Sequence, residues 1–196
     1  YKVAPRGYIC LNHRTTLDMN DADYEALASV SPTDEDSPYK YAFSNGAPMY
    51  SRVPTKEEQE KEDKKFGPRG SYVQLAEWSK GHEELLTTEP IKATDPIPAF
   101  FAGGKRHVGG GNRDTKKLHW RTIPNGSMVA YHKSFEAEGR VWLLTSDLML
   151  VPADRVRAVK KHTFEGVKLG NGVDLPLAWN RSHDPMPLFK KGDDGS

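Results

Sequence analysis

Apolar and polar residues alternate most regularly in the second half of the chain, and this period of two predicts β-strands. Glu138-Gly139 and Ser146-Asp147 interrupt the alternation as turn signals, and Pro152 marks a bend before a last short element. Closely spaced strands joined by tight turns are typical of a small open barrel. The expected elements are strands at 127–135, 140–145 and 148–151 and a short element at 153–159.

The N-terminal part is less regular. A short apolar run at 7–11 predicts a strand, and Tyr24, Leu27 and Ala28 share one side of a possible short helix capped by Asn20. Residues 38–54 contain an Asn-Gly turn and several prolines. Because proline cannot donate to a β-ladder, we expect an extended segment laid along the surface by its aromatic residues, outside any central strand.

The clearest helix follows this segment. Thr55 is an N-cap with Glu58 three residues later, a spacing typical of a capping box, and Gly67-Pro68 ends the helix. This helix has almost no apolar face, which predicts a solvated surface element or a mobile insertion. Residues 71–86 are ambiguous between helix and strand.

These patterns predict a mainly β protein with minor α content, built on a small open barrel with an irregular N-terminal layer. We expect an irregular region with short helices at 1–95, the barrel at 96–165, and a C-terminal tail or linker at 166–196. Tyr131 and Trp142 lie on neighbouring strands, where their bulk suits the barrel interior.

The composition of the chain excludes several kinds of site and segment. The chain has 196 residues, a net charge of +1 and one cysteine, so an internal disulfide and a zinc site built from several thiolates are excluded. The longest apolar runs are far shorter than the roughly 20 residues that cross a bilayer, so we expect no transmembrane segment. Because the sequence opens on Tyr1 without a leader, we expect a piece of a longer or processed protein.

The glycine-rich stretch 96–121 is locally basic, with six Lys and Arg residues. It lacks the spacing of a phosphate-binding loop and of a dinucleotide fingerprint, which predicts a flexible hairpin tip. The basic residues together with Trp120 also match the charge-plus-aromatic pattern of single-stranded nucleic-acid binding. The near-neutral total charge disfavours a nucleic-acid partner, so a solvated loop is the preferred interpretation. The basic residues are Lys105, Arg106, Arg113, Lys116, Lys117 and Arg121.

Catalytic and metal-binding patterns are incomplete. His82-Glu83-Glu84 lacks the second histidine of a zinc-protease helix, and we expect no metal and no cofactor. Cys10 and His13 leave a thiolate–imidazole enzyme open as an alternative, although a cysteine within an apolar strand is typically a small buried hydrophobe. No catalytic residue is assigned. The candidate ligand-binding residues are Tyr131, Trp120, Trp179, Lys105, Arg106 and Arg113.

Several stretches together resemble a known family. They are GSMVAY at 126–131, FEAEGRVW at 135–142, LMLVPADRV at 148–156, GYIC at 7–10, PYKYA at 38–42, PMYSRVPT at 48–55, FEGV at 164–167 and LPLAW at 175–179. Over most of its length the chain resembles the N-terminal, non-catalytic region of myxobacterial-type L,D-transpeptidase-like cell-envelope proteins. The family's catalytic Ser-His-Gly-Cys-Arg type stretch has no counterpart here, so no catalytic residue carries over.

The resemblance implies that the barrel at 96–165 is a small open Src-homology-3-like barrel and that the tail at 166–196 leads toward a missing catalytic domain. It also implies an envelope or periplasmic module that binds or presents peptidoglycan or contacts its own catalytic domain, while the parent protein is a peptidoglycan L,D-transpeptidase. Two alternatives stay open. One is a peptidoglycan enzyme that uses Cys10, and the other is binding of an anionic polymer or nucleic acid through the basic loop 105–121.

Overall fold

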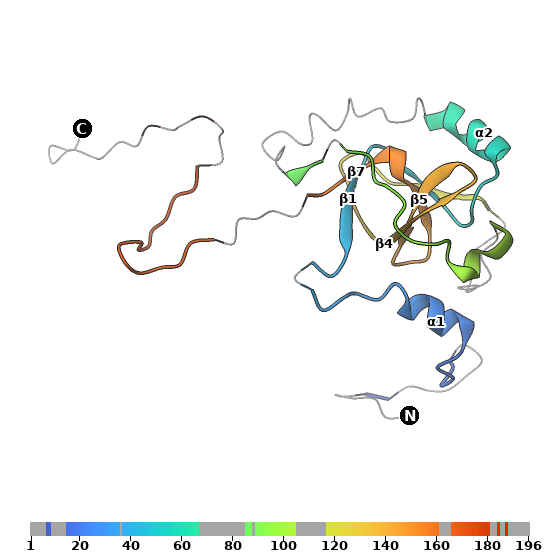
Figure 1. The fold of residues 1–196 in the computed structure, drawn as a ribbon, viewed down its shortest axis with the longest axis horizontal. Helices are drawn as coiled ribbons and strands as arrows, with labels where there is room; N and C mark the ends of the chain where they lie inside the picture. The colour runs from blue at the N-terminus through green and yellow to red at the C-terminus, as the bar shows by residue number, and fades with distance from the viewer. Residues whose placement is uncertain are drawn as a thin grey trace.

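The computed structural model describes residues 7–8, 15–35, 37–66, 85–87, 89–104, 117–160, 166–180, 184 and 187. A seven-stranded antiparallel sheet forms the body of the protein (Figure 1). In chain order the elements are α1 (Ala22–Ala28), β1 (Lys40–Ser44), β2 (Pro48–Tyr50), α2 (Lys56–Phe66), η2 (Ala99–Gly104), β3 (His119–Thr122), β4 (Met128–Ala137), β5 (Arg140–Thr145), β6 (Leu150–Pro152), η3 (Ala153–Arg155) and β7 (Val156–Ala158), where η marks a 3₁₀ turn.

The strands lie in the order β3-β2-β6-β5-β4-β1-β7. β3 and β7 are the two ends of this order, so the sheet is open, and the predicted mainly β class is confirmed. The β4–β5 hairpin forms where the alternation predicts it, and its turn residues Glu138 and Gly139 have φ of 50° and 70°. Two consecutive residues with positive φ match the right-handed twist of a hairpin.

The prediction for residues 38–54 was wrong. This segment supplies β1, which lies between β4 and β7, and β2, which lies between β3 and β6. The sheet tolerates Pro48 because it is the first residue of β2, where a missing N–H costs little. Strands from both sides of the expected boundary at 95/96 therefore belong to one sheet.

The sheet is packed with apolar side chains on both faces. β5 alternates between the two clusters: Trp142 and Leu144 belong to one, and Leu143 to the other. Trp142 is completely buried, as predicted, and its Nε1 donates to the carbonyl of Ala137 at 3.0 Å. Tyr50 packs against it edge-to-face at 5.6 Å. Because aromatic rings fill part of the space on the two faces of this sheet, few Leu, Ile, Val and Phe residues are needed to bury it.

The N-terminal caps of the two helices differ in how well they were predicted. Asp21, not Asn20, caps α1 by accepting from the backbone N–H of Asp23 and Tyr24, and the buried residue of this helix is Ala26. The capping box of α2 is confirmed, since Thr55 and Glu58 exchange backbone-to-side-chain hydrogen bonds of 3.0 and 3.3 Å. Most residues of α2 are exposed, as expected of a surface helix, but one side of it is docked on the body.

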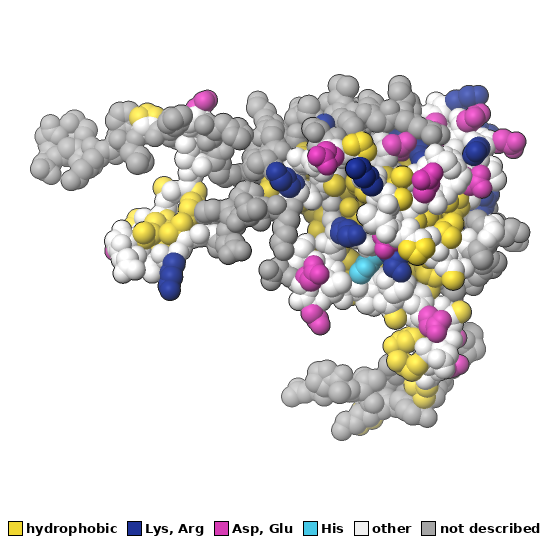
Figure 2. Space-filling view, in the orientation of Figure 1, with side chains coloured by type: hydrophobic (Ala, Val, Ile, Leu, Met, Phe, Trp, Pro, Cys, Tyr) yellow, Lys and Arg dark blue, Asp and Glu magenta, His cyan; other side chains and the backbone are white. Residues whose placement is uncertain are grey.

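Two polar residues dock α2 on the body. Gln59 is 2% exposed and Glu62 is 7% exposed. Lys, Arg, Asp and Glu side chains cover the outward side of this helix (Figure 2).

The segment 166–180 leads away from the sheet (Figure 1) and carries a cluster of apolar side chains on its surface (Figure 2). Its one bridge joins Gly170 to Val173, and Leu175 and Trp179 are exposed. Most of the predicted strand 7–11 and of the ambiguous stretch 71–86 lies outside the described residues.

A candidate aromatic groove

The chain builds a groove where it leaves α1 and enters β1. Residues 33–35 and 37–38 belong to a loop that is closed by a hydrogen bond from the Thr33 N–H to the Pro38 carbonyl at 3.1 Å. Lys40 then pairs with Tyr131 on β4. Between this loop and β4 lies a groove of about 360 Å³, here called the aromatic groove. The residues that line it are Thr33, Glu35, Ser37, Pro38, Tyr39, Lys40, Tyr41, Tyr131, His132 and Val159.

A β-bulge places His132 in this groove. Along the β4–β5 pairing, Tyr131 lies opposite Thr145 and Lys133 lies opposite Leu144, so His132 is the extra residue. A bulge re-aims a side chain and is frequent beside functional sites. Here the His132 ring meets the Tyr39 ring edge-to-face, with centroids 5.1 Å apart. Tyr39 also contacts Tyr41 edge-to-face at 6.3 Å.

The surroundings of His132 in the groove favour the neutral form of its ring. Burial lowers the pKa of His132, and the neighbouring charges of Lys133 and Lys40 lower it further, while a hydrogen bond with the backbone of Ser31 opposes the shift. Nε2 of this ring is buried and meets no hydrogen-bond partner in the described part of the chain. A protonated ring would therefore carry an N–H without an acceptor, which is costly.

Burial also raises the pKa of Tyr131, so its hydroxyl stays protonated at neutral pH. The groove thus offers aromatic rings, tyrosine hydroxyls, one lysine and one carboxylate. Ligand sites are concave, mostly apolar and aromatic, with a few polar groups that fix orientation, and their volumes begin near 300 Å³. The arrangement is suited to holding a small uncharged or zwitterionic unit by its apolar faces.

The structure does not bring the three predicted aromatic residues together. Tyr131 lines the groove and is 6% exposed, so it is both a core residue and part of the site. Trp120 lies on the edge strand β3, and the strands β2, β6 and β5 separate it from β4. Trp179 lies in the segment 166–180 and is 55% exposed. Lys105, Arg106, Arg113, Cys10 and His13 lie outside the described residues.

Sequence reasoning missed Tyr39, Tyr41 and His132. The alternation Tyr39-Lys40-Tyr41 is a signal for a strand with two aromatic side chains on one face, but the prolines nearby argued against it. The bulge that aims His132 depends on how β4 pairs with β5, which the local sequence does not contain.

Neither a metal cluster nor a membrane-spanning helix occurs among the described residues. They contain no group of three or more His, Cys, Asp or Glu side chains that could hold a metal ion. Among the helices described, none has the length and apolar character needed to cross a membrane. The chain matches no protein-family model, no curated protein and no solved structure.

Proposed function

We propose that this chain is a non-catalytic module of the cell envelope that binds peptidoglycan in the aromatic groove. The observation that carries the proposal is the groove itself, which is lined by Tyr39, Tyr41, Tyr131 and the bulged His132, with the Tyr39 ring in edge-to-face contact with the rings of His132 and Tyr41. Rings of this kind pack on the apolar faces of a ligand, and their hydroxyl groups fix its orientation. A polymer of sugars and short peptides offers both kinds of surface.

The proposed fold type is an open Src-homology-3-like barrel. It is supported by the β4–β5 hairpin and by the bend at Pro152, which leads through η3 into the short strand β7. The resemblance to the non-catalytic region of L,D-transpeptidase-like proteins supports an envelope location. In such a protein the module would hold the wall polymer or its own catalytic domain in position, and the parent chain would perform the chemistry.

Charge in the groove supports a binding role for the stem peptides of the polymer. Lys40 and Glu35 both line the groove, so a ligand that carries a carboxylate and an amine would meet a partner for each. Exposed ion pairs contribute roughly 1 kcal/mol or less each, so the aromatic contacts would supply most of the affinity. Binding should therefore survive moderate salt.

Co-sedimentation with purified peptidoglycan sacculi tests the proposal. The wild-type chain should be retained at physiological and at high salt. Tyr39→Ala should weaken retention roughly fivefold, which corresponds to the loss of about 1 kcal/mol of ring contact. Trp120→Ala is the matched control, because it removes an exposed aromatic side chain on β3 outside the groove.

Two results would overturn the proposal. One is the absence of retention at any salt. The other is retention that disappears at high salt and is competed by single-stranded DNA, because phosphate contacts weaken steeply as salt rises. That second result would favour the basic loop as the site.

A further inference from the structure

Asparagine is followed directly by glycine at three places in the chain, and each of these steps lies at a change of chain direction. The steps are 45–46, 125–126 and 171–172. Such a step is chemically labile, because glycine has no side chain to keep its backbone nitrogen away from the side-chain amide of the preceding asparagine. The surroundings of each step therefore decide whether the reaction occurs in the folded protein.

The third step, Asn171-Gly172, forms the tip of a two-residue hairpin in the segment 166–180. Asn171 and Gly172 have φ of 52° and 90°, as expected for the two central residues of such a turn. The Gly170 N–H donates to the Val173 carbonyl at 2.8 Å, and the Val173 N–H donates to the Gly170 carbonyl at 3.2 Å. In the described part of the chain, no other backbone hydrogen bond holds residues 170–173. A hairpin without neighbouring strands is marginally stable in water, so this turn opens easily.

Nothing shields the reacting atoms of this step. Asn171 and Gly172 are both exposed, and a Cβ added at Gly172 would meet no atom within 4 Å. Among the described residues, neither the Gly172 N–H nor the Asn171 side-chain amide meets a hydrogen-bond partner. The backbone nitrogen of Gly172 is therefore free to approach Cγ of Asn171 when the turn opens.

The step Asn125-Gly126 is held at its nitrogen. The Gly126 N–H donates to the carbonyl of Ser44 at 2.8 Å, so this bond must break before the nitrogen can react. The side chain of Asn125 is held as well, because its Oδ1 lies only 2.9 Å from the place that a Cβ at Gly46 would take. Both residues of the step are half-buried.

The step Asn45-Gly46 is held on both sides. The Asn45 N–H donates to the carbonyl of Arg155 at 3.0 Å, and the Ala47 N–H donates to Ser44 Oγ at 2.9 Å. This turn connects β1 to β2, which are both inside the sheet. The rotation that brings the glycine nitrogen to the side-chain amide must therefore disturb packed strands.

We propose that Asn171 is a site of spontaneous deamidation in the folded protein, and that the fold protects Asn45 and Asn125. The Gly172 nitrogen forms a bond to Cγ of Asn171, and the bond from Cγ to Nδ2 breaks. Ammonia leaves with the proton that the Gly172 nitrogen gives up, and a five-membered succinimide ring remains. Water then adds to one of the two ring carbonyl carbons, and the bond from that carbon to nitrogen breaks. The product is aspartate or isoaspartate, and no atom is oxidised or reduced.

The modification changes the character of the segment 166–180. Either product places a new carboxylate three residues before Asp174, on a segment whose exposed side chains include Leu169, Leu175 and Trp179. Isoaspartate also lengthens the backbone by one carbon atom, which shifts the register of the bridge between residues 170 and 173. The segment leads away from the sheet (Figure 1), so the fold of the body should stay unchanged.

Peptide mapping by mass spectrometry tests the proposal on the full chain after incubation in mildly alkaline buffer. Conversion of amide to acid at Asn171 should be at least about fivefold faster than at Asn45 or Asn125, because those two steps must first break hydrogen bonds of packed turns. In urea the three rates should become similar, since each asparagine precedes a glycine. Equal rates in the folded chain, or the same preference for Asn171 in urea, would overturn the proposal.

Asn171→Gln keeps the side-chain amide and lengthens it by one methylene, so that attack would have to close a less favourable six-membered ring. Ion-exchange chromatography of the incubated wild type should show a more acidic species, and this variant should lack it. Asn125→Gln is the matched control and should still form that species. An acidic species that forms equally in the wild type and in Asn171→Gln would show that the modified residue lies elsewhere.

Discussion

His132 couples the aromatic groove to the stability of the sheet. Its ring packs edge-to-face on Tyr39 at 5.1 Å and bonds to the backbone of Ser31, and its position at the bulge of β4 makes both contacts possible. An aromatic pair contributes about 1 kcal/mol and a hydrogen bond about 1 kcal/mol. His132→Ala should therefore lower the free energy of unfolding by about 2 kcal/mol at pH 8.

The same residue should make stability depend on pH. Because burial lowers the pKa of folded His132 below its usual 6.5, the unfolded chain binds a proton more readily than the folded chain. The stabilisation is fully present above pH 6.5 and is lost as pH falls from there through the folded pKa. The slope contributed by this one group cannot exceed about 1.4 kcal/mol per pH unit.

Urea unfolding between pH 8 and 5.5 measures this effect. The wild-type chain should lose stability as pH falls, and His132→Gln should lose less, because glutamine does not titrate. His119→Gln is the matched control, since it removes a histidine from the edge strand β3. Parallel pH curves for the wild type and His132→Gln would refute the reasoning about the groove.

Two further predictions concern the scaffold. Trp142→Phe should lower the free energy of unfolding by about 3 kcal/mol, because about three buried heavy atoms and the hydrogen bond to Ala137 are lost. Calorimetry should show a melting temperature roughly 10 °C lower than that of the wild type. A fall of less than a few degrees would contradict complete burial of the ring. The pKa of Glu58 is lowered from 4.5 to about 2 by its hydrogen bond with Arg52. Glu58→Gln should therefore lower the free energy of unfolding by about 1 kcal/mol at pH 7, and this loss should shrink as pH falls from 4.5 toward 2. The control Glu57→Gln should change the urea midpoint little at either pH, and equal losses in both variants would count against the capping box.

The features that the sequence predicted well are those with local causes. The β4–β5 hairpin depends on a turn at Glu138-Gly139 and on alternation within about ten residues on either side. The start of α2 depends on Thr55 and Glu58, which are three residues apart. Each of these signals is complete within a short window, so the structure reproduces it.

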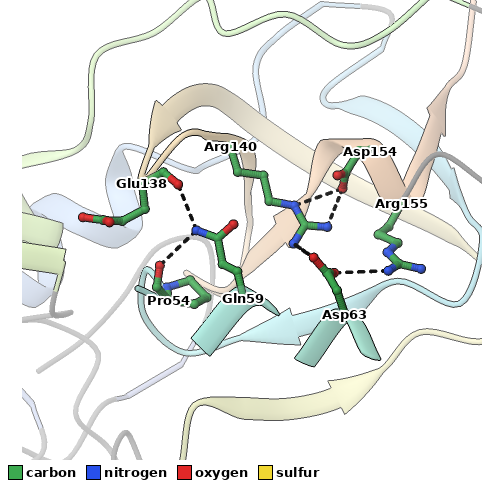
Figure 3. Close-up of polar contacts among 7 residues, drawn as sticks. All are labelled: Pro54, Gln59, Asp63, Glu138, Arg140, Asp154 and Arg155. Atoms are coloured by element: carbon green, nitrogen blue, oxygen red, sulfur yellow. Dashed lines mark hydrogen bonds and ion pairs between the residues drawn. The ribbon is translucent and has the colours of Figure 1, made fainter. Parts of the chain in front are cut away.

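The features that the sequence failed to predict depend on distant partners. β1 is a strand because Ala42 pairs with Val129 on one side and Ala158 on the other. Asp63 holds α2 in place through Arg140 and Arg155, which are 77 and 92 residues away (Figure 3). Without knowledge of these arginines, the charge pattern of α2 predicts only a solvent-exposed helix.

The residues of the aromatic groove likewise fall into those with a local sequence signal and those that depend on distant partners. The place of Tyr131 on a regular strand predicted a core residue, and the structure shows it buried and lining the groove. The opposite wall, which contains Tyr39 and Tyr41, lies about 90 residues earlier in the chain and comes into contact only through the pairing of β1 with β4. Periodicity identifies a strand, but not which strand will lie beside it.

The most direct test of the account is an amide NMR titration of the ¹⁵N-labelled chain with soluble muropeptides released from sacculi. The account predicts that the largest shift changes fall on residues 39–41 and 131–132, and that they saturate together. The result that would contradict it is no shift change in those residues, or changes confined to β3 around Trp120 or to the segment 166–180 that contains Trp179.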